Sequence, residues 1–225
     1  MRIDLFTLFP EFFEWFGAQR HVRNALERGS ELRTFNYRDT TPLGGRQVDD
    51  SPYGGGAGMV LRVDVVDAAL RGAYGDGPPG ARVIVLAASG RPLDDALVTE
   101  LAAERHLALL CGRYEGVDER VREHLADEAI SIGPYVVSGG EVAAMVVADA
   151  VLRKLPGALG HADSALEESY STALEGHPEY PHYTRPPVYR GWGVPDVLVS
   201  GDHERVRDWR RDRSRERGEG QPGSA

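Results

Sequence analysis

The sequence predicts an α/β protein with a mostly parallel sheet, helices on both faces, and a small, mainly helical C-terminal domain. Three observations support this prediction. Apolar strand-like runs alternate with helix-like segments through the first part of the chain, which is typical of a parallel sheet covered by helices. Glycine-containing loops follow several of these runs. From about residue 160 onward the composition changes to small, polar and acidic residues, followed by a strand-like run at Val197–Val199 and then by an arginine-rich helix.

The first elements along the chain are two strands separated by a helix. Residues 2–8 alternate as a strand, and Pro10 begins a helix that we expect to continue to Arg28, with Gly29 ending it. Residues 31–37 read as the second strand.

Residues 38–58 show no apolar period, and irregular segments of this length are usually functional or disordered. Val48-Asp49-Asp50 and the run Gly54-Gly55-Gly56 favour a shaped loop. The glycine run fits a hinge as well as a phosphate cradle, and it lacks the Lys-Ser/Thr pair of a P-loop.

The following elements alternate strictly, and this alternation implies parallel strands with ligands bound beyond their carboxyl ends. The pattern alone favours an open, unknotted sheet. The last helix is apolar on nearly all sides, so more than one of its sides should be buried. The expected elements are a helix over 63–73, a strand over 82–87, a helix from its N-cap Asp94 to Glu104, a strand over 107–110, a helix over 117–124, a strand over 129–132 and a helix over 141–155.

Three loops at the predicted strand ends are candidate ligand-binding loops: residues 86–91, 112–116 and 132–140. In the third loop, glycines remove side chains where the backbone would approach a ligand, and Ser138 precedes a helix N-terminus with unpaired N–H groups. An ordinary strand-to-helix turn is the alternative interpretation.

The composition fits one large domain with a small appendage. The chain has 225 residues, of which 41% are hydrophobic, and its single Cys111 cannot form an intramolecular disulfide. The N-terminal run contains an acidic residue and does not resemble a signal peptide, and no segment has the length and apolarity of a membrane span. We therefore expect a cytoplasmic protein that does not associate with membranes.

Motifs in these loops resemble one family. CGRYEGVDER covers Cys111 to Arg120, and SIGPYVVSGGE covers Ser131 to Glu141. With these motifs the chain resembles the bacterial tRNA (guanine-N(1)-)-methyltransferases of the SPOUT class, over roughly residues 1–213. Further matching segments are Leu8-Phe9-Pro10, Val48 to Met59, and Pro181 to Pro186.

The resemblance implies a homodimer whose three loops form a trefoil knot and hold S-adenosylmethionine in a bent conformation. The substrate would be tRNA with a guanosine at position 37, methylated on N(1). A metal site is not implied, and a requirement for Mg²⁺ is left open. The implied cofactor-binding residues are Leu86, Ala87, Ala88, Ser89, Gly112, Tyr114, Glu115, Ser131, Ile132, Gly133, Pro134, Tyr135, Val136, Val137, Gly139 and Gly140.

The resemblance also implies residues that act on the tRNA. Glu168 matches the position of the family's general base, which is usually an aspartate, and Asp163 is a rival nearby. Arg153 matches an arginine that faces the guanine oxygen, although a cation at a helix C-terminus is also ordinary. The implied tRNA contacts are Glu115, Asp49, Asp50, Tyr53, His182, Tyr183, Arg185, Arg210 and Arg211.

Four positions depart from the usual family pattern: Ala88 and Ser89 replace Pro-Gln, Pro134 replaces Asp, and Ala143 replaces Pro. Main-chain groups would make most of the cofactor contacts in these loops. We therefore expect altered cofactor affinity more than lost activity.

The predicted domains are a knotted cofactor-binding domain (1–159), a linker (160–176), a tRNA-binding domain (177–217) and a disordered tail (218–225). The net charge of −9 does not by itself favour a nucleic-acid partner, but the charge is unevenly distributed. Interleaved acidic residues also fit a solvated helix with internal ion pairs. The arginines of this C-terminal helix are Arg205, Arg207, Arg210, Arg211, Arg213, Arg215 and Arg217.

Two other function classes compete with a methyltransferase. A nucleotide-binding oxidoreductase is disfavoured, because the sequence has no strand-GxGxxG-helix unit followed by an acidic residue. A catalytically inactive RNA-binding homodimer on the same scaffold is the remaining alternative.

Overall fold

The computed structural model describes residues 1–77, 80–159 and 168–219. The chain divides into two compact units, Met1–Leu159 and Gly160–Ala225. Within the described residues, no helix combines the length and apolarity that crossing a membrane requires.

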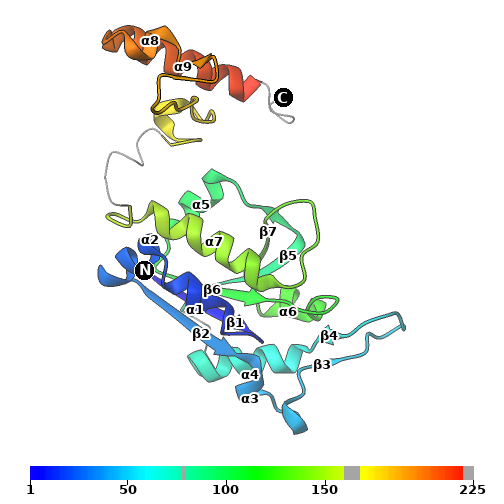
Figure 1. Cartoon of the computed structure of the whole chain (residues 1–225). Helices are drawn as coiled ribbons and strands as arrows, with labels where there is room; N and C mark the ends of the chain where they lie inside the picture. Colours follow the sequence, from blue (N-terminus) through cyan, green and yellow to red (C-terminus); the bar gives the residue numbers. More distant parts are fainter. Residues whose placement is uncertain (78–79, 160–167, 220–225) are drawn as a thin grey trace. The chain divides into compact units, whose positions relative to one another are not determined.

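The first unit is built on a five-stranded sheet with the order β2-β1-β6-β5-β7, and all neighbouring strands are parallel (Figure 1). The prediction of a parallel sheet is thereby confirmed. The strands are β1 (Arg2–Thr7), β2 (Glu31–Asn36), β5 (Arg82–Pro92), β6 (His106–Cys111) and β7 (Glu128–Ser131).

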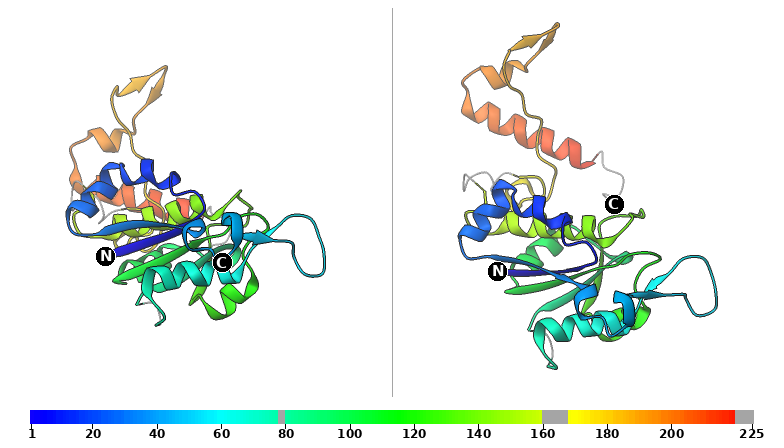
Figure 2. Two further views of the ribbon diagram at one scale, coloured as in Figure 1. Left: turned by 90° about the horizontal axis from the view of Figure 1, so that it is seen from below. Right: turned by 60° about the horizontal axis from the view of Figure 1, so that its bottom comes forward.

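Helices cover both faces of this sheet (Figure 2). Successive strand side chains point to opposite faces, so Leu107 and Leu109 of β6 belong to one apolar cluster, and Ala108 and Leu110 to the other. The first cluster packs against α1 (Phe12–Gly17), α2 (Arg20–Glu27), α5 (Asp95–Ala102) and α7 (Gly140–Lys154); the second packs against α3 (Tyr37–Thr40), α4 (Val63–Tyr74) and α6 (Glu119–His124).

Two predicted elements of this unit differ from the structure. The helix expected from Pro10 to Arg28 is two helices, because the backbone at Gln19 is extended (φ −64°, ψ 143°). The loop expected over 86–91 lies within β5, whose pairing with β7 changes register between Leu86 and Arg91. Gly90 lets β5 lie close against β7 at this register change, because a Cβ on residue 90 would stand 2.6 Å from the main chain of Ile130.

The segment that shows no apolar period contains an antiparallel hairpin of β3 (Asp49–Asp50) and β4 (Val60–Leu61), preceded by a 3-10 turn at Gly44–Arg46. The main chain of this hairpin is bonded to a predicted ligand loop: Glu115 N donates to Met59 O at 3.0 Å, and Leu61 N donates to Gly116 O at 3.0 Å. The hairpin is therefore anchored beside the carboxyl edge of the sheet.

The second unit contains a short hairpin, β8 (Val188–Tyr189) with β9 (Trp192–Gly193), a 3-10 turn (Thr172–Leu174), and helices α8 (Asp196–Val199) and α9 (His203–Glu219). The sequence suggested a strand at Val197–Val199, and this is wrong. Pro195 before the segment and Asp196 in its first turn both favour a helix start over a strand. Helix α9 also continues through Gly218 and Glu219, two residues into the expected tail.

Asp4 is a fully buried carboxylate in β1, an interior strand of the sheet. It accepts hydrogen bonds from Arg2 Nη2 (2.6 Å) and Tyr74 Oη (2.8 Å), and His106 Nε2 lies 2.9 Å from the same Oδ2. Burial acts to raise the pKa of Asp4, but the hydrogen bonds from these three side chains outweigh burial and hold the pKa below its usual value. The ionised form is therefore the one that the fold stabilises.

We expect Asp4→Asn to lower the free energy of unfolding at pH 7 by about 3 kcal/mol, because it removes the charge that compensates Arg2. The pKa of Asp4 is lower in the folded state than in the unfolded chain. Its ionised carboxylate therefore stabilises the fold above the unfolded pKa of about 3.9, and this stabilisation is lost as the pH falls. Urea unfolding should therefore show a smaller difference between variant and wild type at pH 3.5 than at pH 7. The control is Asp39→Asn, an exposed partner of Arg46, which should change stability little. A difference that does not depend on pH would contradict this account of Asp4.

Candidate functional site

A cavity of about 480 Å³ lies where the carboxyl ends of β5, β6 and β7 meet. It is lined by residues 85–89, 112–117, 130–133 and 135–140, together with Glu119, Arg122 and Ala143. Its volume lies within the range of about 300–1,000 Å³ typical of small-molecule and cofactor sites. The predicted cofactor-binding residues all line this cavity, with the exception of Pro134.

Close backbone approach builds the wall between β6 and α7. Gly140, the first residue of α7, donates its N–H to the carbonyl of Gly112 at 2.8 Å. A Cβ at Gly140 would stand 2.6 Å from Cys111 Cα. The glycine is therefore required for the helix to begin directly against the end of β6.

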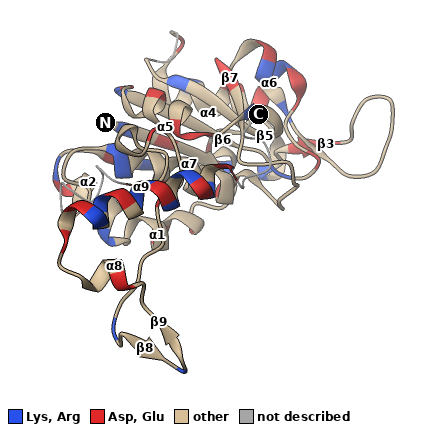
Figure 3. Ribbon diagram, turned by 90° about the horizontal axis from the view of Figure 1, so that it is seen from above, with Lys and Arg blue, Asp and Glu red and all other residues tan. Residues whose placement is uncertain are grey.

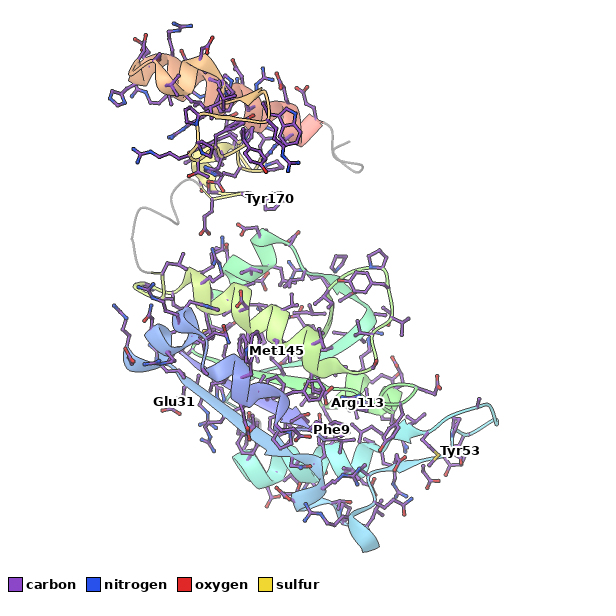
Figure 4. The ribbon with its side chains drawn as sticks, in the orientation of Figure 1. Phe9, Glu31, Tyr53, Arg113, Met145 and Tyr170 are labelled. Atoms are coloured by element: carbon purple, nitrogen blue, oxygen red, sulfur yellow. The ribbon has the colours of Figure 1, made fainter. Side chains whose placement is uncertain are left out.

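A buried ion pair joins two of the cavity loops to β1. Glu141, which is 1% exposed, accepts a hydrogen bond from Thr7 Oγ1 at 2.7 Å, and its other carboxylate oxygen lies 3.0 Å from Arg113 Nε. Arg113 Nη1 donates to the carbonyl of Ser138 at 3.2 Å. The Arg113 guanidinium lies 4.3 Å from the centre of the Phe9 ring, and Figure 4 shows the two residues side by side.

This cluster fixes the loop that ends at Ser138 to the loop that begins at Gly112. Sequence reasoning gave Arg113 and Glu141 no role, although both stand inside the quoted motifs. Thr7 gave no signal, because its partner is 134 positions away.

The cavity also contains ionisable side chains near its rim. Arg122 Nη1 donates to Ser89 Oγ at 3.1 Å, so one of the residues that depart from the family pattern is bonded to a cavity cation. Glu115 lies against Gly58 of the β3–β4 hairpin, where any side chain on that glycine would collide with the carboxylate. Glu119 is the second carboxylate of the lining, and sequence reasoning missed both Glu119 and Arg122.

The predicted tRNA contacts of the first unit lie on or beside the β3–β4 hairpin. Asp50 Oδ2 is held by Arg62 Nη1 at 3.2 Å, and Tyr53 in the hairpin turn is fully exposed. Asp49 lies in β3. Because this hairpin is bonded to the loop of Glu115, Asp49, Asp50 and Glu115 belong to one connected part of the site.

Arg153 does not lie at the cavity of its own chain. The cavity meets α7 at Gly140 and Ala143, and a helical rise of 1.5 Å per residue places Arg153 about 15 Å beyond Ala143 along the axis. Glu168 belongs to the second unit, where its carbonyl accepts a hydrogen bond from Ser171 N at 3.0 Å. The rival base Asp163 lies outside the described residues.

The predicted tRNA contacts of the second unit lie close together. The Arg210 guanidinium lies 4.8 Å from the Tyr180 ring, and Tyr183 packs on Trp209 with 6.3 Å between ring centres. The Tyr180–Arg185 segment, with His182 and Arg185 exposed, therefore packs along α9. Helix α9 carries charges of both signs (Figure 3), and Arg211 lies 3.9 Å from Asp208.

Apolar side chains are exposed on the neighbouring helices α1 and α7. Phe12 and Trp15 of α1 are 40% and 68% exposed, and Val142 and Val146 of α7 are 44% and 42% exposed. We call these four residues the α1/α7 apolar surface. Val142, Val146 and Arg153 follow a spacing of four and seven, so the half-buried Arg153 lies on the same face of α7 as the two exposed valines.

The parallel sheet and the cavity at its carboxyl edge define an α/β protein that binds a cofactor-sized ligand at that edge. The model of the tRNA (Guanine-1)-methyltransferase TrmD family matches residues 1–221. The chain belongs to this family, and the family resemblance drawn from the motifs is confirmed.

Curated relatives with the name tRNA (guanine-N(1)-)-methyltransferase support the same assignment. The relative from Brevibacillus brevis is 51% identical over 213 residues, covering 93% of this chain and 85% of the relative. The relative from Halorhodospira halophila is 51% identical over 210 residues, covering 93% and 78%. The relative from Dehalococcoides mccartyi strain CBDB1 is 47% identical over 215 residues, covering 95% and 86%.

Proposed function

We propose that this chain transfers a methyl group from S-adenosylmethionine to N(1) of guanosine 37 of tRNA, in the cytoplasm. The observation that supports this most directly is the cavity at the carboxyl edge of the sheet, lined by the motif residues of a chain that belongs to the family. The competing interpretation as an inactive RNA-binding homodimer finds no support, because the cavity is present and the relatives of this chain are named as methyltransferases.

The cavity fits S-adenosylmethionine by size and by chemistry. The loops at Gly112 and at Ile132–Gly140 offer main-chain N–H and C=O groups to the adenosine, and Glu115 and Glu119 are carboxylates that favour a positive sulfonium. Bound there, the cofactor would supply the electrophilic methyl group. That the three loops thread as a trefoil knot stays a prediction.

Methylation of N(1) requires removal of its proton and alignment of the ring nitrogen with the methyl group. In this proposal Glu168 accepts the N(1) proton. Arg153 donates to the exocyclic oxygen, where negative charge develops as the proton leaves. The Arg113–Glu141 pair holds the cavity loops in place and touches neither reacting atom.

A homodimer brings Arg153 to a cavity. Two α7 helices that pack antiparallel across a two-fold axis near Val146 would place Arg153 of one subunit beside Gly140 of the other. The α1/α7 apolar surface is the surface that such a dimer would bury. Arg153 would therefore act in the partner's cavity, because its position on α7 keeps it away from the cavity of its own subunit.

The tRNA would contact both units. Asp49, Asp50 and Tyr53 belong to the hairpin whose main chain is hydrogen-bonded to the cavity loop at Glu115 and Gly116. His182, Tyr183 and Arg185 lie with Arg210 and Arg211 in the second unit. Splayed bases and backbone phosphates are the features that exposed aromatic and arginine side chains recognise in a single-stranded RNA loop.

A methyl-transfer assay tests this proposal directly. With labelled S-adenosylmethionine, we expect methylation of a tRNA transcript that carries guanosine 37, no methylation of the adenosine 37 transcript, and 1-methylguanosine in the digested product. Calorimetric titration with S-adenosylmethionine should show binding in the absence of RNA. Cofactor binding without transfer to any transcript would identify an inactive binder and overturn the proposal.

A further inference from the structure

The β8–β9 hairpin exposes aromatic side chains that nothing in the site described so far uses. Tyr189 and Trp192 are cross-strand partners, 52% and 69% exposed, with 5.9 Å between ring centres. Arg190 in the turn places its guanidinium 5.3 Å from the centre of the Tyr189 ring. The hairpin therefore presents two adjacent ring faces and one cation.

The turn is built for a tight hairpin. Arg190 and Gly191 have positive φ of 50° and 84°, which is the conformation of a two-residue type I′ turn. One further main-chain hydrogen bond, from Val194 N to Pro187 O at 2.9 Å, closes the hairpin. Isolated two-stranded hairpins are marginally stable in water, and all residues of this one from Val188 to Gly193 are exposed.

Local charge favours an anionic partner. The whole chain has a net charge of −9, yet the 16 residues from Tyr180 to Pro195 contain Arg185 and Arg190 and no Asp or Glu. On the hairpin itself, Figure 3 shows blue where Arg190 lies and no red. A surface that pairs exposed rings with arginine in an acid-free segment matches single-stranded RNA, whose bases stack and whose phosphates are negative.

We infer that Tyr189, Trp192 and Arg190 form a stacking surface for unpaired bases of the tRNA substrate. This inference rests on the proposed function, since it assigns a further contact of the same RNA. Stacking is tolerant of base identity, so the hairpin would add affinity and leave the choice of the methylated guanosine to the cavity.

The test measures the Kd of the full chain for a fluorescein-labelled tRNA transcript at several salt concentrations. We expect Trp192→Ala to raise Kd about tenfold or more, with an unchanged dependence on salt. Trp192→Phe should retain most of the affinity, because a ring remains. Arg190→Gln should weaken binding and reduce the slope of log Kd against log salt by about 1.

The matched control is Val188→Ala in the same hairpin, because Val188 is 61% exposed and has no ring. It should bind the transcript like wild type. The hairpin surface could instead bind a second copy of the chain, and sedimentation of Trp192→Ala tests this alternative. An altered oligomeric state with unchanged RNA affinity would overturn the inference. Methylation by the wild-type chain together with unchanged Kd for Trp192→Ala would reject the hairpin surface and leave the proposed function intact.

Discussion

We expect the replacement of Glu168 by Gln to lower kcat by about a hundredfold or more and to leave the Kd for S-adenosylmethionine near the wild-type value. The amide is nearly isosteric with the carboxylate but cannot accept the N(1) proton, and loss of a general base typically costs about 10² to 10⁴ in rate. Single-turnover transfer to the guanosine 37 transcript measures the effect on chemistry, and calorimetry measures cofactor binding separately.

The conservative variant separates a base from a structural carboxylate. Glu168→Asp keeps a carboxylate at this position, and it should retain activity. Asp163→Asn is the matched control within the same segment of chain and should leave kcat unchanged. Near wild-type activity of Glu168→Gln combined with an inactive Asp163→Asn would transfer the base assignment to Asp163.

The second large effect is expected at Gly140. The Cβ of Gly140→Ala would stand 2.6 Å from Cys111 Cα and 2.8 Å from Gly112 N. Both atoms belong to the main chain at the end of β6, so α7 must move away from the strand, and the Gly112 and Ser138 loops must separate. We expect cofactor affinity to fall about a hundredfold or more and the melting temperature to fall by several degrees.

Gly17→Ala is the control for this prediction. A Cβ at Gly17 meets no atom within 4 Å, and the residue lies at the end of α1. Alanine there should leave cofactor affinity unchanged and stability unchanged or slightly higher. Wild-type cofactor affinity in Gly140→Ala would show that the close approach of α7 to β6 does not shape the cavity.

The strands and their parallel arrangement could be predicted from the sequence, because β-branched and aliphatic runs such as Val83–Leu86 alternate regularly with helical patterns. The break between helices α1 and α2 at Gln19 could not be predicted, since the helical apolar periodicity of the sequence continues across a single extended residue. Val197–Val199 misled the interpretation because a short β-branched run suits a strand or a turn of helix, and Pro195 decides between them.

The cavity lining could be predicted from family motifs, whereas the contacts that hold it together could not. The cluster of Thr7, Arg113 and Glu141 joins three distant parts of the chain, and only the paired strands β1 and β6 bring them within reach. The hydrogen bond between Arg122 and Ser89 likewise joins residues that lie far apart in the sequence. Spacing along a sequence carries no information about such pairs.

The hydrogen bond between Thr7 and Glu141 also has a consequence for biosynthesis. The two residues are separated by 134 positions, and β1 lies between β2 and β6 in the sheet. β1 therefore gains its neighbour β2 early but its neighbour β6 only much later in translation, and the cavity wall is complete only after α7 has been translated. Pairings of such long sequence separation fold slowly, because closing the intervening chain costs entropy before any contact forms. A chain that stops short of α7 lacks Glu141, the shared partner of Thr7 and Arg113, and it also lacks the part of the cavity lining that Gly140 and Ala143 provide.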